Sequence, residues 1–156
     1  MEPADCGAFG AGGKFFGILI KLPNAQPTNS YLTKSVSFYY FFARKVCLAF
    51  GAEVFIFFPG GFGTLDEFFE IITLVQTKKI QGAPIICVGS EYWNKLKGFM
   101  EEELIKRGTI APEDLNLFTI TDSHDEILEI IKNAPVKANV PFSGLAHEAE
   151  VTVDLK

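Results

Sequence analysis

The sequence lacks any run rich in lysine and arginine, and its 156 residues carry a formal net charge of −5 at pH 7. A protein that binds nucleic acid by neutralising phosphates needs a basic surface. This composition excludes that class of protein. We therefore expect no nucleic-acid partner.

The sequence also lacks a hydrophobic stretch long enough to cross a membrane. Its densest apolar segment, residues 35–50, is interrupted by Arg44 and Lys45. It falls short of the roughly 20 apolar residues that a membrane-spanning helix needs. The first nine residues are acidic and have no basic region followed by an apolar core, as a secretory signal would. These features predict a cytoplasmic protein with no membrane partner.

Cysteine and histidine are scarce. Cys6, Cys47 and Cys87 are an odd number without a Cys-x-x-Cys pair, which indicates neither a disulfide framework nor a zinc site. His124 and His147 have no ligand partner at a spacing typical of metal sites. We expect the cysteines to fill an apolar core in a reducing compartment. We expect no metal and no other cofactor.

Apolar residues, in contrast, are abundant. The composition is 48% hydrophobic and includes 16 phenylalanines. A single domain of this length buries roughly two thirds of the surface that its unfolded chain exposes. The apolar content is higher than a soluble domain of this size requires. We expect part of the apolar surface to contact a partner.

Short apolar runs alternate along the chain with segments in which apolar residues recur at helical spacing. Short apolar runs predict buried strands, and the segments after them have helical spacing. This alternation predicts an α/β fold, a Rossmann-like doubly wound parallel sheet with helices on both faces. The expected strands are residues 14–22, 53–58, 83–89 and 116–121, and the expected helices are residues 33–50, 64–79, 92–107 and 125–132.

One α/β domain is expected over residues 1–133, opening with a helix of about eight residues. Residues 134–156 contain two prolines and no sustained periodicity, which indicates an extended or mobile tail. Four strands make a narrow sheet, and a strand as apolar as FFGILI would lie uncovered at its edge. We therefore expect the domain to lack its first strand or strands and the glycine loop that would follow them.

A turn that holds three glycines separates the second expected strand from a helix expected to open at Thr64. Backbone N–H groups at the start of a helix form an anion site, and phosphate is the usual ligand. The turn also fits a purely structural role, because Thr64 and Glu67 have the spacing of a capping box. The glycine pattern matches neither the P-loop nor the dinucleotide motif and leaves both alternatives open. The turn comprises Pro59, Gly60, Gly61, Phe62 and Gly63.

The string PGGFGTLDE, residues 59–67, resembles the PGGxGTxxE signature of the Lonely Guy (LOG) family of nucleoside 5′-monophosphate phosphoribohydrolases. Upstream, ARKVCLAFGAEVFIFFPGG resembles the family's Arg-Lys helix and the strand after it. Arg44 lies 23 residues before Glu67, as the family's catalytic arginine lies before its glutamate. The likeness covers about residues 1–132 and continues through TLVQTKKI, PIICVG and EYWNKL.

The first residues, MEPADCGAFGAGGKFFGI, resemble the family segment that follows an earlier glycine loop. The chain is therefore expected to be truncated at its N-terminus relative to the family. Members have also been labelled possible lysine decarboxylases. That activity needs a lysine in a recognisable pyridoxal-phosphate setting, which the lysines of this sequence do not have.

The resemblance implies hydrolysis of the N-glycosidic bond of AMP or a cytokinin riboside monophosphate, an AMP nucleosidase-like reaction that yields free base and ribose 5-phosphate. It also implies a homodimer. Such a bond breaks through an oxocarbenium-like state, which an anionic group near the sugar stabilises. Glu67 would supply that group, and Arg44 would hold Glu67 or the departing base. Each also has a structural alternative, Glu67 as a helix cap and Arg44 as a solvated side chain.

The resemblance implies that the glycine turn binds the 5′-phosphate. Its N–H groups and the Thr64 hydroxyl would cradle the 5′-phosphate. Lys45 would contact the phosphate or else lie on a solvated helix face. The expected phosphate-binding residues are Lys45, Gly60, Gly61, Gly63 and Thr64.

Two further readings stay open. Proteins resembling molybdenum-cofactor carriers use a similar PGGxGT turn to hold a phosphorylated ligand without cleaving it. The chain could also be a truncated product with no activity of its own. Arg44 together with Glu67 favours the enzyme, whereas loss of the first glycine loop favours binding alone. The aromatic segment FYYFFARK fits a core, a base-stacking wall or a subunit contact.

Overall fold

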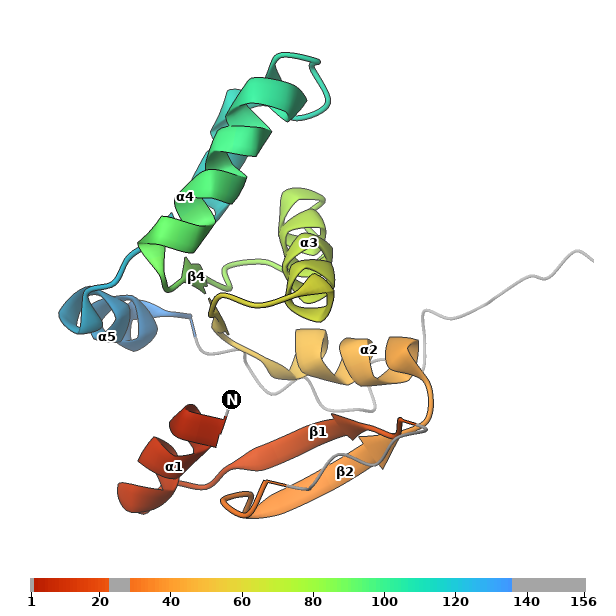
Figure 1. The fold of residues 1–156 in the computed structure, drawn as a ribbon, viewed down its shortest axis with the longest axis vertical. Helices are drawn as coiled ribbons and strands as arrows, with labels where there is room; N and C mark the ends of the chain where they lie inside the picture. Colours follow the sequence, from red (N-terminus) through yellow and green to blue (C-terminus); the bar gives the residue numbers. More distant parts are fainter. Residues whose placement is uncertain (1, 23–28, 136–156) are drawn as a thin grey trace, which may run out of the picture.

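The computed structural model describes residues 2–22 and 29–135 (Figure 1). Its helices are α1 (Glu2–Gly10), α2 (Phe41–Gly51), α3 (Phe62–Gln76), α4 (Ser90–Phe99) and α5 (His124–Asn133). Its strands are β1 (Phe16–Ile20), β2 (Lys34–Phe38), β3 (Phe55–Phe57), β4 (Ile85–Cys87) and β5 (Thr119–Ile120). A π-helical segment, η1 (Met100–Ile105), continues α4, and a 3-10 segment, η2 (Pro112–Leu117), precedes β5.

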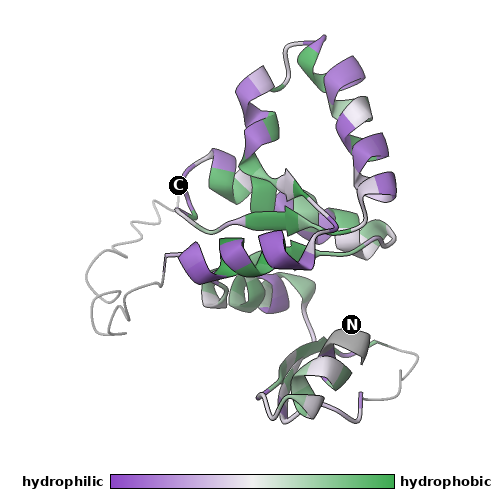
Figure 2. Cartoon of the chain, turned by 90° about the vertical axis from the view of Figure 1, so that its left-hand side faces the viewer, coloured by the Kyte–Doolittle hydropathy of each residue, from purple (hydrophilic) through white to green (hydrophobic). Residues whose placement is uncertain are grey.

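The strands form two separate parallel sheets. One sheet has three strands in the order β3-β4-β5, with Phe55 opposite Ile85 and Ile86 opposite Thr119. The other pairs β1 with β2. Parallel strands joined by helices confirm the expected α/β class with a Rossmann-like arrangement. Figure 2 shows the two-stranded sheet apart from the three-stranded one.

The core lies around the three-stranded sheet. All three residues of β4 are buried, as expected for a central parallel strand covered on both faces. The Phe68 side chain of α3 is fully buried and lies at the centre of an aromatic cluster. Its ring centroid is 5.5 Å from that of Phe57, 4.9 Å from Trp93 and 5.4 Å from Phe118. Such ring pairs stabilise a core beyond the area that they bury.

The segment before β3 contributes little to this core. Among the described residues that precede Phe55, Ala49 alone belongs to the buried hydrophobic cluster. Several large apolar side chains of the same segment are exposed instead. Exposed apolar surface of this extent is typical of a surface that contacts a partner. The exposed aromatic residues of this segment are Phe9, Phe16, Tyr39, Tyr40, Phe41, Phe42 and Phe50.

The structure corrects two of the expected elements. Residues 34–38, expected within a helix, form β2, and the helix begins only at Phe41. Polar and apolar residues alternate in KSVSF with the period of a strand, and β1 offers a parallel partner. Residues 112–117, partly expected as a strand, form the 3-10 segment that begins at Pro112.

The remaining elements agree within a few residues with those expected. The expected tail, residues 134–156, lies outside the described residues except for its first two positions. None of the helices in residues 2–22 and 29–135 combines the length and apolar character that a membrane span requires.

Phe68 tests the aromatic core. Phe68→Ala should lower the free energy of unfolding by about 3–5 kcal/mol, because it leaves a cavity among Phe57, Trp93 and Phe118. Phe62→Ala is the matched control on the same helix, because the Phe62 side chain is 93% exposed. Phe62→Ala should change the free energy of unfolding by no more than about 0.5 kcal/mol. Urea denaturation measures both variants, and equal losses would contradict this account of the core.

Candidate active site

The glycine turn ends in an uncapped helix. The first helical residue of α3 is Phe62, two positions before the expected start, and Gly61 is the N-cap with φ −91° and ψ −156°. The Gly61 carbonyl accepts hydrogen bonds from the N–H groups of Thr64 and Leu65, both at 3.1 Å. Gly61, as the N-cap, has no side chain that could cap this end of the helix. Thr64 lies inside α3, so the alternative of a capping box with Thr64 as its N-cap is excluded. The helix start carries the positive end of the helix dipole.

Glycine is required in the turn for space. A Cβ at Gly60 would collide with the hydroxyl of Thr64, which lies against the turn. The positions beside Gly61 and Gly63 are open, so a ligand can approach their backbone closely. None of these three glycines has a positive φ, so none is required here for left-handed backbone.

Arg44 connects three elements. On α2, its Nη1 donates to Oε1 of Glu67 on α3 at 2.8 Å, and its Nε donates to the carbonyl oxygen of Ile18 in β1 at 2.9 Å. The Arg44 and Glu67 side chains are only 19% and 22% exposed. Burial raises the pKa of the Glu67 carboxyl above its usual range, and the charge of Arg44 opposes that rise. The structure thus brings together the two expected catalytic residues and holds Glu67 in a half-buried position.

Lys45 lies beside this pair and contacts two carboxylates of α3. Its Nζ is 2.9 Å from Oε2 of Glu70 and 3.0 Å from Oδ2 of Asp66. These hydrogen bonds, that to Glu70 above all, raise the pKa of Lys45. The Lys45 ammonium would have to exchange one of these partners in order to reach a phosphate.

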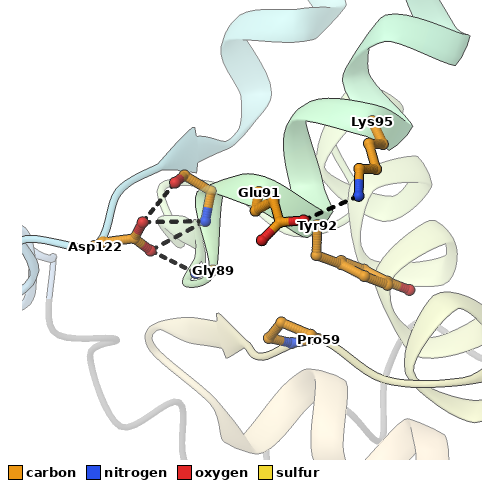
Figure 3. Close-up of a pocket in the computed structure, with 7 residues that line it drawn as sticks. Pro59, Gly89, Glu91, Tyr92, Lys95 and Asp122 are labelled. Carbon is orange, nitrogen blue, oxygen red and sulfur yellow. Dashed lines mark hydrogen bonds and ion pairs between the residues drawn. The ribbon is translucent and has the colours of Figure 1, made fainter.

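A cleft of about 390 Å³ opens at the carboxyl ends of the three-stranded sheet (Figure 3). Pro59, Gly89 and Asp122, which line it, each lie two residues beyond the end of a strand. In open parallel sheets, ligands bind in a crevice outside the carboxyl ends of the strands. The Tyr92 hydroxyl joins the cleft to the glycine turn by donating to the Gly60 carbonyl at 2.8 Å.

Asp122 occupies the N-terminus of α4. Its carboxylate accepts hydrogen bonds from the Gly89 N–H at 2.7 Å, the Ser90 N–H at 3.0 Å and the Ser90 hydroxyl at 2.5 Å. These bonds, that of the Ser90 hydroxyl first, lower the pKa of Asp122. The anion position of α4 is therefore filled by the protein, whereas that of α3 has no side-chain cap.

Sequence reasoning did not single out Asp122 or Tyr92. A signal existed for Asp122, because it directly follows the expected strand 116–121, where polar residues of parallel sheets often gather. No comparable signal marked Tyr92, since its contact with Gly60 depends on how α4 packs against the turn.

The cysteines differ from expectation in part. Cys6 and Cys47 are exposed, so they do not fill the core, whereas Cys87 is buried in β4. Burial raises the pKa of the Cys87 thiol to about 12, which leaves it protonated and unreactive. In the part of the chain that the structure describes, no group of three or more His, Cys, Asp or Glu residues could hold a metal ion. His124 begins α5, and His147 lies outside the described residues.

Comparison with known proteins shows a family match over most of the chain. The family model described as "possible lysine decarboxylase" matches residues 1–131. The cytokinin riboside 5′-monophosphate phosphoribohydrolase LOG1 of Arabidopsis thaliana is 31% identical over 91 residues, 58% of this chain and 42% of that protein. A probable enzyme of the same name from rice, LOG4, is 32% identical over 92 residues, 58% of this chain and 39% of that protein.

A bacterial relative extends the match. The cytokinin riboside 5′-monophosphate phosphoribohydrolase of Rhodococcoides fascians is 28% identical over 107 residues, 67% of this chain and 54% of that protein. The chain thus spans about half the length, or less, of the curated relatives that it matches.

Asp122 yields a prediction on stability and pH. Asp122→Asn should lower the melting temperature at neutral pH, because it removes the carboxylate that satisfies the start of α4. The folded-state pKa lies below the ordinary 3.8, so this stabilisation is present above pH 3.8 and is lost as the pH falls through the folded value. The difference in melting temperature between Asp122→Asn and the wild type should therefore shrink in strong acid.

Thermal unfolding followed by circular dichroism across this pH range measures the effect. Glu101→Gln is the matched control, because Glu101 is an exposed carboxylate on the continuation of α4. A difference that stays constant in strong acid would show that the Asp122 charge does not contribute.

Proposed function

The chain belongs to the family described as possible lysine decarboxylases, the family of the LOG phosphoribohydrolases, and on this premise we propose that it hydrolyses the N-glycosidic bond of a nucleoside 5′-monophosphate. The products would be a free base and ribose 5-phosphate. The observation that carries the proposal is the half-buried pair of Arg44 and Glu67 on two helices, beside the uncapped start of α3. The proposed substrates are AMP and cytokinin riboside monophosphates. The names of the relatives mention the latter.

The 5′-phosphate binds at the start of α3 in this proposal. The Phe62 and Gly63 N–H groups, which precede those that bond to the Gly61 carbonyl, would donate to the phosphate, and open space beside Gly61 and Gly63 allows close approach. The Thr64 hydroxyl, which lies against Gly60, adds a further donor. Glu67 follows Phe62 by five residues, or roughly 7.5 Å along the helix axis. A ribose whose phosphate sits on this turn can therefore place its anomeric carbon near the Glu67 carboxylate.

Glu67 then supports the reaction in two ways. As the bond from C1′ to the base nitrogen breaks, its electron pair leaves with the base, and the carboxylate stabilises the positive charge on the sugar. A water molecule forms the new bond to C1′ and gives its proton to Glu67. The departing base takes up a proton from solvent, and Glu67 later releases its own proton to solvent, so the carboxylate is restored. The raised pKa of Glu67 makes it a stronger base than an exposed glutamate.

Arg44 orients this carboxylate. Its Nη1 holds Glu67, its Nε is held by the Ile18 carbonyl, and its Nη2 makes no hydrogen bond within residues 2–22 and 29–135. In this proposal, that nitrogen contacts the sugar or the base. Lys45 serves the phosphate after exchanging Asp66 or Glu70 for it.

A second candidate is a carrier that binds a phosphorylated ligand without cleaving it. It is favoured by the extent of the match, because the chain spans only 42% of LOG1 of Arabidopsis thaliana and 54% of the Rhodococcoides fascians enzyme. The glycine turn would serve either function in the same way.

Glu67→Gln distinguishes these functions. The variant should lower the release of adenine and ribose 5-phosphate from AMP by about a hundredfold or more, because it removes the charge and the base together. Glu113→Gln, on an exposed part of η2, should retain full activity. The release of adenine and ribose 5-phosphate measures the activity. Calorimetry measures the binding of AMP separately. Unchanged release in Glu67→Gln would refute the role of this residue, and AMP binding without release by the wild type would favour the carrier.

We propose further that the protein is a homodimer in which the exposed aromatic residues around the start of α2 contact a second copy. Phe42 is 69% exposed and stacks on Tyr40, which is also exposed. Light scattering should give twice the chain mass of 17.2 kDa for the wild type. Phe42→Asp should shift it to the monomer, whereas Phe62→Asp should not. A monomeric wild type would overturn the proposal.

A further inference from the structure

Tyr92 joins two elements that lie far apart in the sequence. Its hydroxyl, on the first turn of α4, donates a hydrogen bond to the Gly60 carbonyl at 2.8 Å. Gly60 belongs to the glycine turn, 32 positions earlier in the chain. Pro59, the first residue of that turn, lines the same cleft as Tyr92 (Figure 3). The start of α4 therefore contacts the turn at which the proposed function places a phosphate.

The Tyr92 side chain is itself held in place. Asp122 binds the first N–H groups of α4, and the Tyr92 N–H donates to the Gly89 carbonyl at 3.0 Å. The ring of Tyr92 packs edge-on against that of Trp93, with the two centroids 5.1 Å apart. Trp93 is only 1% exposed, and its indole N–H donates to the Val88 carbonyl at 3.1 Å. The Tyr92 hydroxyl is thus a donor in a fixed position.

Gly89 adds a second contact between α4 and the turn. Its φ of +101° lies in the left-handed region that favours glycine. A Cβ at this position would lie only 2.6 Å from Cγ of Pro59, so the Gly89 backbone packs directly against the proline ring. This close approach leaves the Tyr92 hydroxyl within reach of the Gly60 carbonyl.

The hydrogen bond from Tyr92 fixes the peptide between Gly60 and Gly61. A trans peptide directs its C=O and its N–H in opposite directions. Because Tyr92 holds the Gly60 carbonyl, the Gly61 N–H points away from Tyr92. Within residues 2–22 and 29–135, no group accepts a hydrogen bond from this N–H. It directly precedes the N–H groups of Phe62 and Gly63, to which the proposed function assigns the phosphate.

A peptide between two glycines can also adopt the reverse orientation. Reversal would change the φ of Gly61 from −91° to a positive value, which glycine adopts at little cost. The reversed peptide would direct the Gly60 carbonyl oxygen, instead of the Gly61 N–H, toward the phosphate. Two groups that both carry negative charge repel each other. The hydrogen bond from Tyr92 therefore stabilises the orientation that suits an anion.

We propose that Tyr92 is a positioning residue of the phosphate site, whose hydroxyl holds the Gly60–Gly61 peptide with the Gly61 N–H toward the 5′-phosphate. This inference rests on the proposed function for the place of the phosphate, but not for the cleavage of the substrate. A turn that is held in its binding orientation before the ligand arrives loses less free energy on binding. Tyr92 acts through the turn and contacts no reacting atom.

Ribose 5-phosphate tests this role without any need for hydrolysis. Tyr92→Phe keeps the ring and its contact with Trp93 and removes only the hydroxyl. It should weaken the binding of ribose 5-phosphate to the full chain, measured by calorimetry, by about twofold to tenfold, the size expected for one hydrogen bond. Thr77→Val is the matched control. It removes a hydroxyl that donates to the Thr73 carbonyl at 2.7 Å, at the far end of α3, and should bind ribose 5-phosphate as the wild type does.

Three calorimetric results would overturn the inference. Equal affinity of Tyr92→Phe and the wild type would show that the hydroxyl does not position the turn. An equal loss of affinity in Thr77→Val would show a general effect of a lost hydrogen bond on the fold. No binding of ribose 5-phosphate by the wild type would refute the phosphate site and the role of Tyr92 together.

The kinetic constants for AMP separate positioning from a general loss of structure. The phosphate is bound equally in the substrate complex and in the transition state, so Tyr92→Phe should raise KM and leave kcat within about twofold of the wild type. A lower kcat with unchanged KM would contradict the role of Tyr92. A wild type that binds ribose 5-phosphate without cleaving AMP would refute the hydrolase, whereas the calorimetric comparison would still decide the role of Tyr92.

Nuclear magnetic resonance locates the effect at the turn. Inorganic phosphate, added to the isotope-labelled full chain, should shift the amide signal of Gly61 in the wild type. The shift should be smaller in Tyr92→Phe at the same phosphate concentration. The Gly89 amide is the internal reference, because it donates to Asp122 at 2.7 Å and is not available to phosphate. A Gly61 amide that does not respond to phosphate in the wild type would overturn the proposal.

Discussion

The hydrogen bonds of Arg44 are the interaction on which the candidate site depends. One side chain reaches β1 through the Ile18 carbonyl and α3 through the Glu67 carboxylate, and thus links the two separate sheets. A charge pair of this kind costs desolvation, which its hydrogen bonds offset only in good geometry. The arrangement therefore favours one orientation of Glu67. It also relates that orientation to the position of β1, so whatever contacts β1 can act on the site.

The contrast between two helix starts decides where an anion can bind. Asp122 satisfies the first N–H groups of α4, and these hydrogen bonds, together with that of the Ser90 hydroxyl, lower its pKa. The N-cap of α3 is Gly61, which has no side chain to serve as a cap, and the open space beside Gly61 and Gly63 leaves room for a ligand. A helix start without a cap retains its positive end for a ligand. The protein thus places its own carboxylate at one strand end, and a phosphate at the neighbouring one remains part of the proposed function.

Much of this could be predicted from local patterns. The apolar runs and the glycine turn placed β3, β4 and α3 within a few residues, because burial on both faces and helical spacing leave a direct mark on residue order. The strand β2 was missed, since the aromatic run after it extends a helical pattern backward and only pairing with β1 decides its state. The exposure of Cys47 on α2 was likewise unpredictable, because it depends on which face of the helix meets a neighbour.

By itself the sequence determined the α/β class, the glycine turn and the family, since these depend on periodicity and on a short contiguous motif. Tertiary structure alone decided that Glu67 meets Arg44 and does not cap α3, that Lys45 is held by two carboxylates and that Asp122 closes the start of α4. The reason is physical. Each of these contacts joins residues at least 21 positions apart. Their energies depend on distance and burial, which residue order along the chain does not specify.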